Sequence, residues 1–261
     1  MNHDLQARLD LAVAASREAG RLTLDFFRRE DLAVEQKHDL SPVTIADRQA
    51  EQLLRGKIAA AFPADGVLGE EFGETTGTSG YRWILDPIDG TKSFIRGVPL
   101  YGTLVAVEHG GRSVIGVIFI PALDECAYAA SGCGCWYERA GRPREAARVS
   151  TRATLAESLL SASETRFPPS RQEAYNRLQR ASLVSRTWGD CYGYLLVATG
   201  RAEVMIDPVM NLWDVAALQP ILEEAGGTLT NWQGERTIYS PEAMATNGLV
   251  LGEVLTITRG H

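Results

Sequence analysis

Two aspartates end an apolar run in the segment WILDPIDGT, residues 83–91. The run predicts a buried strand, and the aspartates are Asp86 and Asp89. Carboxylates at the end of a buried strand are costly, because an uncompensated buried charge is destabilising or shifts its pKa. A hard divalent cation, which binds clustered carboxylate oxygens, would compensate them. Gly90 and Thr91 come next and can offer backbone N–H groups to an anion. A metal site beside an anion site indicates phosphate chemistry.

Two further acidic residues border apolar stretches. Glu70 follows the short apolar segment 67–69, and Asp214 begins a predicted helix whose next residues are all apolar. Each acid has a plainer explanation on its own: a solvated side chain for Glu70, a helix N-cap for Asp214, and a turn for the 86–89 segment. Taken together, the acids predict one cluster of carboxylates.

Such a cluster suits two or three Mg²⁺ ions, which take octahedral oxygen ligands and keep several waters. Glu70 and Asp86 could share one ion. Asp86, Asp89 and Asp214 could share a second ion, with the Ile88 carbonyl as a further ligand. A two-metal site activates water and stabilises the leaving oxygen of an in-line displacement.

The residues after the second aspartate suit the other reactants. Thr91 stands at the predicted start of a short helix, where its hydroxyl could orient the attacking water. The N–H groups of Gly90 and Thr91 would meet phosphate oxygens. The sequence therefore predicts metal-assisted hydrolysis of a phosphate ester.

The N-terminal half, residues 1–145, combines two predicted helices with a β-meander. Apolar residues three to four apart predict a helix over 5–29. Ser41 as N-cap and Pro42 in the first turn predict the start of a second helix, which ends at Phe62. Polar residues 73–80 predict a loop. The predicted strands are 67–71, 81–86, 101–107, 113–120, 125–130 and 134–138, the last four forming an antiparallel meander.

The C-terminal half, residues 146–261, alternates strands with helices. The predicted strands are 159–163, 182–186, 202–206 and 228–231, and the predicted helices are 169–181, 190–199 and 213–225. This alternation is typical of an α/β structure. We expect the two halves to share an interface near residue 145 and to form one unit.

The composition narrows the class of protein. The chain has 261 residues, 45% of them hydrophobic, and a net charge of −7 without a dense Lys/Arg run, which argues against a nucleic-acid surface. No stretch reaches the roughly 18 apolar residues of a membrane span, and the N-terminus lacks the features of a signal peptide. We therefore expect a cytoplasmic protein. The four cysteines lack zinc or redox spacing, which favours reduced, partly buried thiols.

Three motifs resemble the signatures of the inositol monophosphatase family. They are GEE at 69–71, DPIDGT at 86–91 and WDVAA at 213–217 with EAGG at 224–227. The resemblance spans nearly the whole chain and keeps the family's order. It implies a layered αβαβα fold and Mg²⁺-dependent phosphomonoester hydrolysis in a homodimer that lithium inhibits.

The same resemblance implies roles for individual residues. The implied metal ligands are Glu70, Asp86, the Ile88 carbonyl, Asp89 and Asp214. Thr91 would activate the water together with Glu70, and Asp47 would hold Thr91. Lys37 is similar to the family's loop lysine near the metals.

Two other segments resemble the histidinol-phosphate phosphatase branch of this family. They are residues 92–104 and residues 188–194, the latter followed by Gly200-Arg201-Ala202. Arg96 stands where that branch suggests histidine, and we expect it to be exposed. The resemblance implies hydrolysis of histidinol phosphate in histidine biosynthesis.

The amine and imidazole of that substrate can both be cationic, so its pocket should contain carboxylates. Asp190 and Asp207 are the candidates, although a helix N-cap and a turn respectively are plainer roles for them. Arg186 and Trp188 could line the same pocket, and Trp188 could equally belong to the core.

Other functions fit part of this pattern. An inositol-1-phosphatase or a broad sugar phosphatase is the alternative within the enzyme class, whereas the short chain and the segment after Thr91 make a 3′-phosphoadenosine phosphatase a poorer fit. The alternative of another class is a catalytically silent regulatory or binding protein of the same fold. The intact set of acids argues against it, because losing one ligand would leave the others uncompensated.

Overall fold

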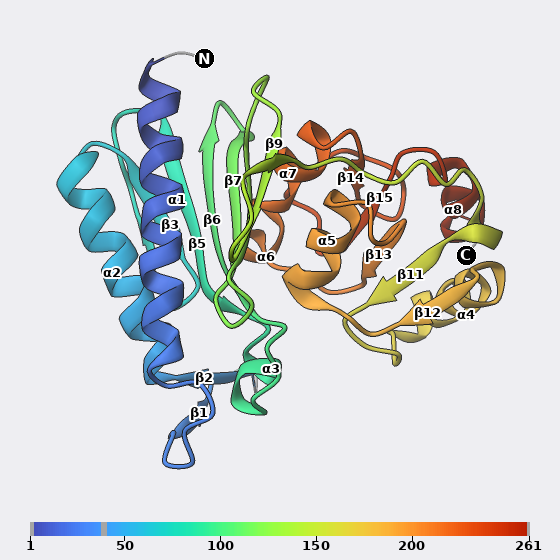
Figure 1. The fold of residues 1–261 in the computed structure, drawn as a ribbon, viewed down its shortest axis with the longest axis horizontal. Coiled ribbons are helices and arrows are strands. Elements are labelled where there is room, and N and C mark those ends of the chain that lie inside the picture. Colours follow the sequence, from blue (N-terminus) through green and yellow to red (C-terminus); the bar gives the residue numbers. More distant parts are fainter. Residues whose placement is uncertain (1–2, 38–40, 260–261) are drawn as a thin grey trace.

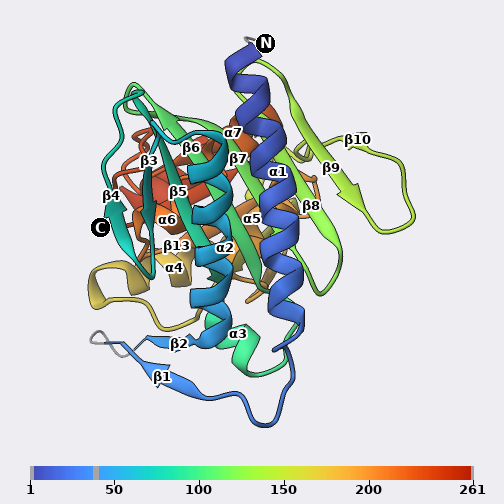
Figure 2. The same ribbon diagram turned by 90° about the vertical axis from the view of Figure 1, so that its left-hand side faces the viewer.

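Helices and sheets alternate in layers across the molecule, of which the computed structural model describes residues 3–37 and 41–259 (Figure 1). The helices are α1 (His3–Leu24), α2 (Ile45–Ala61), α3 (Thr91–Ile95), α4 (Pro169–Ala181), α5 (Asp190–Ala198), α6 (Leu212–Val215), α7 (Leu218–Glu224) and α8 (Leu251–Thr258). Helices α1 and α2 cover one face of the first sheet, as Figure 2 shows from their side. Helices α5, α6 and α7 lie between the two sheets, and α4 and α8 cover the far face of the second. The predicted αβαβα layering is confirmed.

The first sheet has eight strands in the order β10-β9-β8-β7-β6-β5-β3-β4. They are β3 (Gly66–Gly69), β4 (Gly73–Thr75), β5 (Tyr81–Asp89), β6 (Gly102–His109), β7 (Arg112–Ile120), β8 (Glu125–Ala130), β9 (Cys135–Arg139) and β10 (Glu145–Ala146). Strands β6 to β9 form the predicted antiparallel meander. Strand β3 pairs in parallel with β5, so the ends of both strands reach the same edge.

The second sheet has five strands in the order β12-β11-β13-β15-β14. They are β11 (Leu159–Ala162), β12 (Val184–Arg186), β13 (Val204–Asp207), β14 (Thr228–Thr230) and β15 (Ala243–Thr246), preceded in the chain by a 3₁₀ turn at Leu155–Glu157. Strand β11 runs parallel to both β12 and β13, whereas β15 is antiparallel to its neighbours. The predicted α/β alternation of this half is confirmed.

The two faces of strand β5 pack against different hydrophobic clusters. Trp83 and Leu85 are buried against α1 and α2, whereas Ile84 belongs to the cluster that includes α5 and α7. Successive side chains of a strand alternate between its faces. Asp86 therefore continues the row of Ile84 and faces the middle helices.

The predicted start of the second helix is wrong. Pro42–Thr44 forms strand β2, which pairs with β1 (Val34–Gln36), and α2 begins at Ile45 with Thr44 as its N-cap. A capping box explains this start: Thr44 Oγ1 accepts from the Ala46 N–H at 3.1 Å, and the Asp47 carboxylate accepts from the Thr44 N–H at 2.8 Å. The sequence also predicts a polar break over residues 37–42, of which residues 38–40 lie outside the described residues.

Other boundaries also differ from the prediction. The first helix ends at Leu24 rather than near residue 29, and the predicted loop 73–80 contains β4. The predicted helix 213–225 is broken into α6 and α7, because Pro220 has no N–H for the carbonyl four residues earlier. None of the described helices is long and apolar enough to cross a membrane.

Candidate active site

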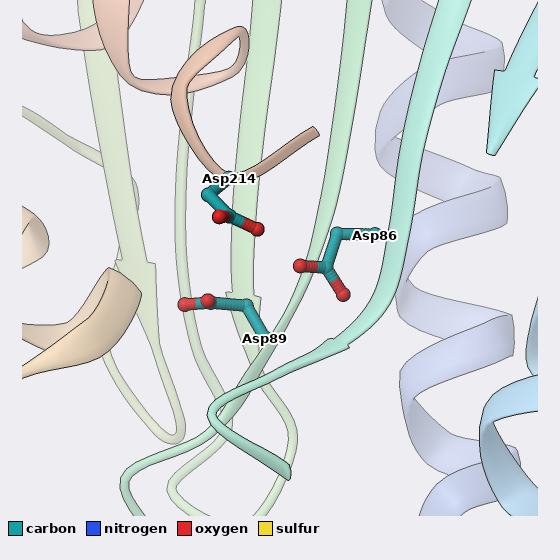
Figure 3. Close-up of side chains that lie close together, drawn as sticks. All are labelled: Asp86, Asp89 and Asp214. Atoms are coloured by element: carbon teal, nitrogen blue, oxygen red, sulfur yellow. The ribbon is translucent and has the colours of Figure 1, made fainter. Parts of the chain in front are cut away.

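Three carboxylates converge where β5 ends beside α6. Asp86 and Asp89 belong to β5 and Asp214 to α6, and one oxygen from each lies within 4.8 Å of the others (Figure 3). Asp86 is buried, whereas Asp89 and Asp214 are partly exposed. The structure thus brings together three of the acids that the sequence predicts as one cluster.

A bulge in β5 allows both of its aspartates to reach this site. In a regular strand, residues three apart point to opposite faces. Here Asp86 pairs with Leu104 and Asp89 pairs with Gly102, so β5 contains one residue more than its partner. Pro87 lies in the bulge, where a missing N–H costs no ladder bond, and its carbonyl accepts from Thr103 Oγ1 at 2.9 Å.

Asp214 is fixed by the residue that begins its helix. Asn211 is the N-cap of α6, and its N–H donates to Asp214 Oδ2 at 2.7 Å. The plainer reading of Asp214 as N-cap is therefore wrong, because Asp214 is the third residue of the helix. Gly116 on β7 lets the segment between α6 and α7 approach the sheet, since a Cβ there would lie 2.0 Å from the Ala217 carbonyl oxygen.

The electrostatics of the cluster suit a divalent cation. Burial raises the pKa of Asp86 well above its usual range, and the neighbouring carboxylates of Glu70, Asp89 and Asp214 raise it further. Burial likewise raises the pKa of Asp89, and that of Asp214 to about 6. Mutually repelling carboxylate oxygens at this spacing are the donor set that hard cations take, so the residues fit a metal ion.

Glu70 lies beside the three carboxylates and is paired with a lysine. Its N–H donates to the Leu85 carbonyl at 3.2 Å, which places it next to Asp86. Lys37 Nζ lies 2.7 Å from Glu70 Oε1 and 2.6 Å from Glu71 Oε1. Burial alone would lower the pKa of Lys37, but its bonds to both glutamates raise it above the ordinary value. Lys37 thus contacts the predicted metal ligand directly.

Thr91 and Asp47 have other partners than the predicted one. Thr91 Oγ1 donates to the Ile88 carbonyl at 3.0 Å, whereas Asp47 Oδ2 accepts from Thr44 Oγ1 at 2.6 Å. Among the hydrogen bonds of the described residues, none joins Asp47 to Thr91, and the capping box of α2 uses Asp47 Oδ2. Burial raises the pKa of Asp47 to about 6.

A cavity of about 290 Å³ opens over the cluster. Its lining includes the three carboxylates, Glu70, Ile88, Gly90, Thr91, Lys92, Ser163, Glu164, Asp190, Tyr194 and Asp207. The predicted phosphate-binding and metal-binding residues therefore share one cavity with both predicted substrate carboxylates.

Asp190 and Asp207 are linked through one serine. The Asp190 N–H donates to Ser163 Oγ at 2.8 Å, and the Ser163 N–H donates to Asp207 Oδ1 at 3.1 Å. The other oxygen of Asp207 accepts from the Tyr194 hydroxyl at 3.0 Å. Burial raises the pKa of Asp207 to about 7. Gly189 is the N-cap of α5, so the plainer reading of Asp190 as N-cap is wrong.

The arginine and the tryptophan predicted near this pocket lie elsewhere. Among the described residues, the lining of the cavity includes neither Arg186 nor Trp188. Arg186 is exposed and donates to the Ser185 carbonyl, and Trp188 is 40% exposed and so not a core residue. Arg96 is exposed, as expected.

Several lining residues were not predicted from the sequence. Ser163 and Tyr194 both donate hydrogen bonds to Asp207 from distant segments of the chain, and no local sequence pattern predicts these long-range bonds. Asn211 could have been found, because Asn followed three residues later by an acid is the spacing of a capping box. Lys92 directly follows Thr91, and its charge lowers the raised pKa of Asp190.

Comparisons with known proteins place this geometry in a family. The sequence model of the inositol monophosphatase family matches residues 4–258. A histidinol-phosphatase of Chlorobaculum parvum is 45% identical over 100% of this chain and 98% of its own length. One from Mycobacterium tuberculosis is 40% identical over 98% of each chain. The crystal structure of the extragenic suppressor protein SuhB of Bartonella henselae superposes with a TM-score of 0.89, at 28% identity over 97% of this chain and 98% of that chain. The chain belongs to the inositol monophosphatase family.

Proposed function

We propose that this protein is a Mg²⁺-dependent phosphomonoesterase that hydrolyses histidinol phosphate to histidinol and phosphate. One observation carries the proposal: the cavity over Asp86, Asp89 and Asp214 is also lined by Asp190 and Asp207. The first set suits metal ions and a phosphate, and the second suits a cationic leaving group. The two relatives named histidinol-phosphatase support the same substrate.

The metal ligands would be Glu70, Asp86, the Ile88 carbonyl, Asp89 and Asp214. Two or three Mg²⁺ ions suit such a set of oxygen donors. When bound, Mg²⁺ would lower the pKa of the attacking water and offset the charge that develops on the leaving oxygen. Because Lys37 pairs with Glu70, we expect metal loading to compete with this ion pair.

Thr91 and Glu70 would orient the attacking water. The Thr91 hydroxyl donates to the Ile88 carbonyl, so its oxygen lone pairs remain available to accept a hydrogen bond from the water. The carboxylate of Glu70, on the same cavity, would accept the other hydrogen of the water and take that proton as the water oxygen bonds to phosphorus and the ester oxygen leaves. Gly90 has a left-handed backbone, φ 84°, which turns the chain so that its N–H and that of Thr91 can meet phosphate oxygens.

Asp190 and Asp207 would bind the cationic end of the substrate. Both line the cavity, and Ser163 holds them in a fixed relation to each other. A carboxylate that binds an ammonium or imidazolium group makes a charge-assisted hydrogen bond, which a neutral sugar hydroxyl cannot match. The pair therefore favours histidinol phosphate over inositol 1-phosphate.

A substrate panel tests this proposal. Purified protein with Mg²⁺ should release phosphate from histidinol phosphate with a higher kcat/KM than from inositol 1-phosphate or a sugar phosphate. The reverse ranking would assign the protein to the inositol or sugar phosphatases of the same family. Absence of phosphate release from every ester would instead support a catalytically silent protein.

We further propose that the protein acts in histidine biosynthesis, works as a homodimer and is inhibited by lithium. Sedimentation velocity should give about twice the mass of the 28.4 kDa chain. A single monomeric species at micromolar concentration would refute the dimer. Phosphate release that lithium leaves unchanged would refute the inhibition.

A further inference from the structure

Glu51 on α2 is a buried carboxylate directed at the turn that follows β3. Its side chain is 0% exposed. Its Oε2 accepts from the Glu71 N–H at 2.7 Å, and its Oε1 accepts from the Phe72 N–H at 3.2 Å. Burial of a carboxylate is costly unless its oxygens are satisfied, and here two backbone donors satisfy them. Both donors belong to the residues directly after Glu70.

The residue before Glu70 also contacts this carboxylate. A Cβ on Gly69 would lie 2.0 Å from Glu51 Oε1 and 2.3 Å from its carboxyl carbon. Only a glycine therefore leaves room for the carboxylate against the end of β3. Glu51 thus touches the backbone on both sides of Glu70.

Arg55 completes the support one turn further along α2. Its Nε donates to Glu51 Oε1 at 2.7 Å, and its Nη2 donates to the Gly73 carbonyl. The ion pair compensates the charge of Glu51, and the guanidinium holds the far end of the same turn. The 69–73 backbone is therefore clamped to α2 by two charged side chains.

We propose that Glu51 is a positioning residue for the metal site, which fixes the backbone so that the Glu70 carboxylate stays beside Asp86. The inference rests on the proposed function in one respect, namely that Glu70 is a metal ligand. Groups that orient a ligand without touching the metal typically change metal affinity or activity by about 10- to 100-fold. Glu51 does not line the cavity formed by the described residues, so its effect must pass through Glu70.

The test compares Glu51→Gln with Glu203→Gln. Glu203 is also 0% exposed and also accepts from a backbone N–H, that of Leu159, and from an arginine, Arg152. It precedes β13 at the end opposite Asp207, away from the metal ligands. Both variants should lower the melting temperature. Only Glu51→Gln should weaken Mg²⁺ binding, by about 10- to 100-fold in Kd, measured by calorimetric titration of Mg²⁺ alone.

The kinetic readout separates positioning from general damage. In Glu51→Gln, the Mg²⁺ concentration that gives half-maximal phosphate release should rise with the Kd, while kcat at saturating Mg²⁺ should recover toward wild type. Mg²⁺ binding equal to that of wild type and Glu203→Gln would overturn the inference. Wild-type protein that binds Mg²⁺ but releases no phosphate would refute the proposed function, and the comparison of Mg²⁺ affinities would still decide the role of Glu51.

A second variant keeps the inference testable if Glu51→Gln does not fold. Gly69→Ala should displace the Glu51 carboxylate from the other side and weaken Mg²⁺ binding in the same way. Both substitutions disrupt the same contact, that of the Glu51 carboxylate with the backbone at the end of β3. The double variant should therefore bind Mg²⁺ no more weakly than whichever single variant has the lower Mg²⁺ affinity. Gly69→Ala with unchanged Mg²⁺ affinity, or additive losses in the double variant, would contradict the proposal.

Discussion

Asp190→Asn should reduce the preference for histidinol phosphate over inositol 1-phosphate without disturbing the fold. Asp190 has a left-handed backbone, φ 51°, and asparagine is among the few residues that tolerate this conformation. The substitution also keeps the size of the side chain. Its N–H can still donate to Ser163 Oγ, because that bond uses the backbone. The change therefore removes one negative charge from the cavity and little else.

The loss can be estimated from the contact that we propose. A hydrogen bond to a charged group contributes about 1.5–3 kcal/mol. At about 1.4 kcal/mol per tenfold change, kcat/KM for histidinol phosphate should fall about 10- to 100-fold. A neutral ester such as inositol 1-phosphate should lose little. The assay is phosphate release from both esters at saturating Mg²⁺, with melting temperatures measured in parallel.

The two substrates distinguish the possible roles of Asp190. An equal fall in kcat/KM for both esters would show that Asp190 supports the metal cluster or the fold. Such a result would refute a direct role in substrate binding. It would instead be explained by the negative charge of Asp190, which raises the pKa of the predicted metal ligand Asp89. An unchanged kcat/KM for histidinol phosphate would exclude Asp190 as a substrate contact.

Three further predictions concern a metal ligand, the raised pKa values of two cavity carboxylates, and the buried ion pair between Arg8 on α1 and Asp65 before β3. Asp89→Asn should lower kcat by at least about 100-fold, because it removes a charged metal ligand, and near-normal phosphate release would show that the site is misplaced. The pKa of about 7 for Asp207 and about 6 for Asp214 means that the folded state binds protons which the unfolded state releases, so its stability falls as the pH rises from about 4 to 7. The metal-free protein should therefore melt at a higher temperature at about pH 5.5 than at about pH 7.5, and the opposite order in EDTA would contradict the pKa values. Asp65→Asn should destabilise the protein by about 3–5 kcal/mol in urea unfolding, because the buried Arg8 of α1 loses the carboxylate at 2.8 Å and keeps the more exposed Asp4 carboxylate at 3.3 Å. A loss below about 1 kcal/mol would mean that Asp4 and water replace the Asp65 pair.

The carboxylate cluster was predictable from the sequence because each acid follows or begins an apolar element. Apolar runs predict buried strands, and an acid at the end of such a run requires compensation. This reasoning identified Asp86, Asp89 and Asp214, which the structure brings together. The bulge that aligns the two aspartates of β5 was not predicted, although Pro87 is a signal for one.

Features that depend on contacts between distant segments could not be predicted from the sequence. Ser41 and Pro42 look like the N-cap and first turn of a helix, and only the pairing of β1 with β2 shows that Pro42 belongs to a strand. The capping box that engages Asp47 was not predicted, because its recognition depends on α2 beginning at Ile45. Arg186 was placed near the substrate from its neighbours in the chain, whereas β12 directs it to solvent at the edge of the second sheet.

The most direct measurement of the central claim is phosphate release from histidinol phosphate by the purified protein in three conditions: with Mg²⁺, after EDTA, and after Mg²⁺ is restored. We predict release with Mg²⁺, loss of release in EDTA and full recovery on restoration, with Asp214→Asn inactive throughout. Release that persists in EDTA, or that survives in Asp214→Asn, would contradict a metal-dependent reaction at the Asp86, Asp89 and Asp214 cluster.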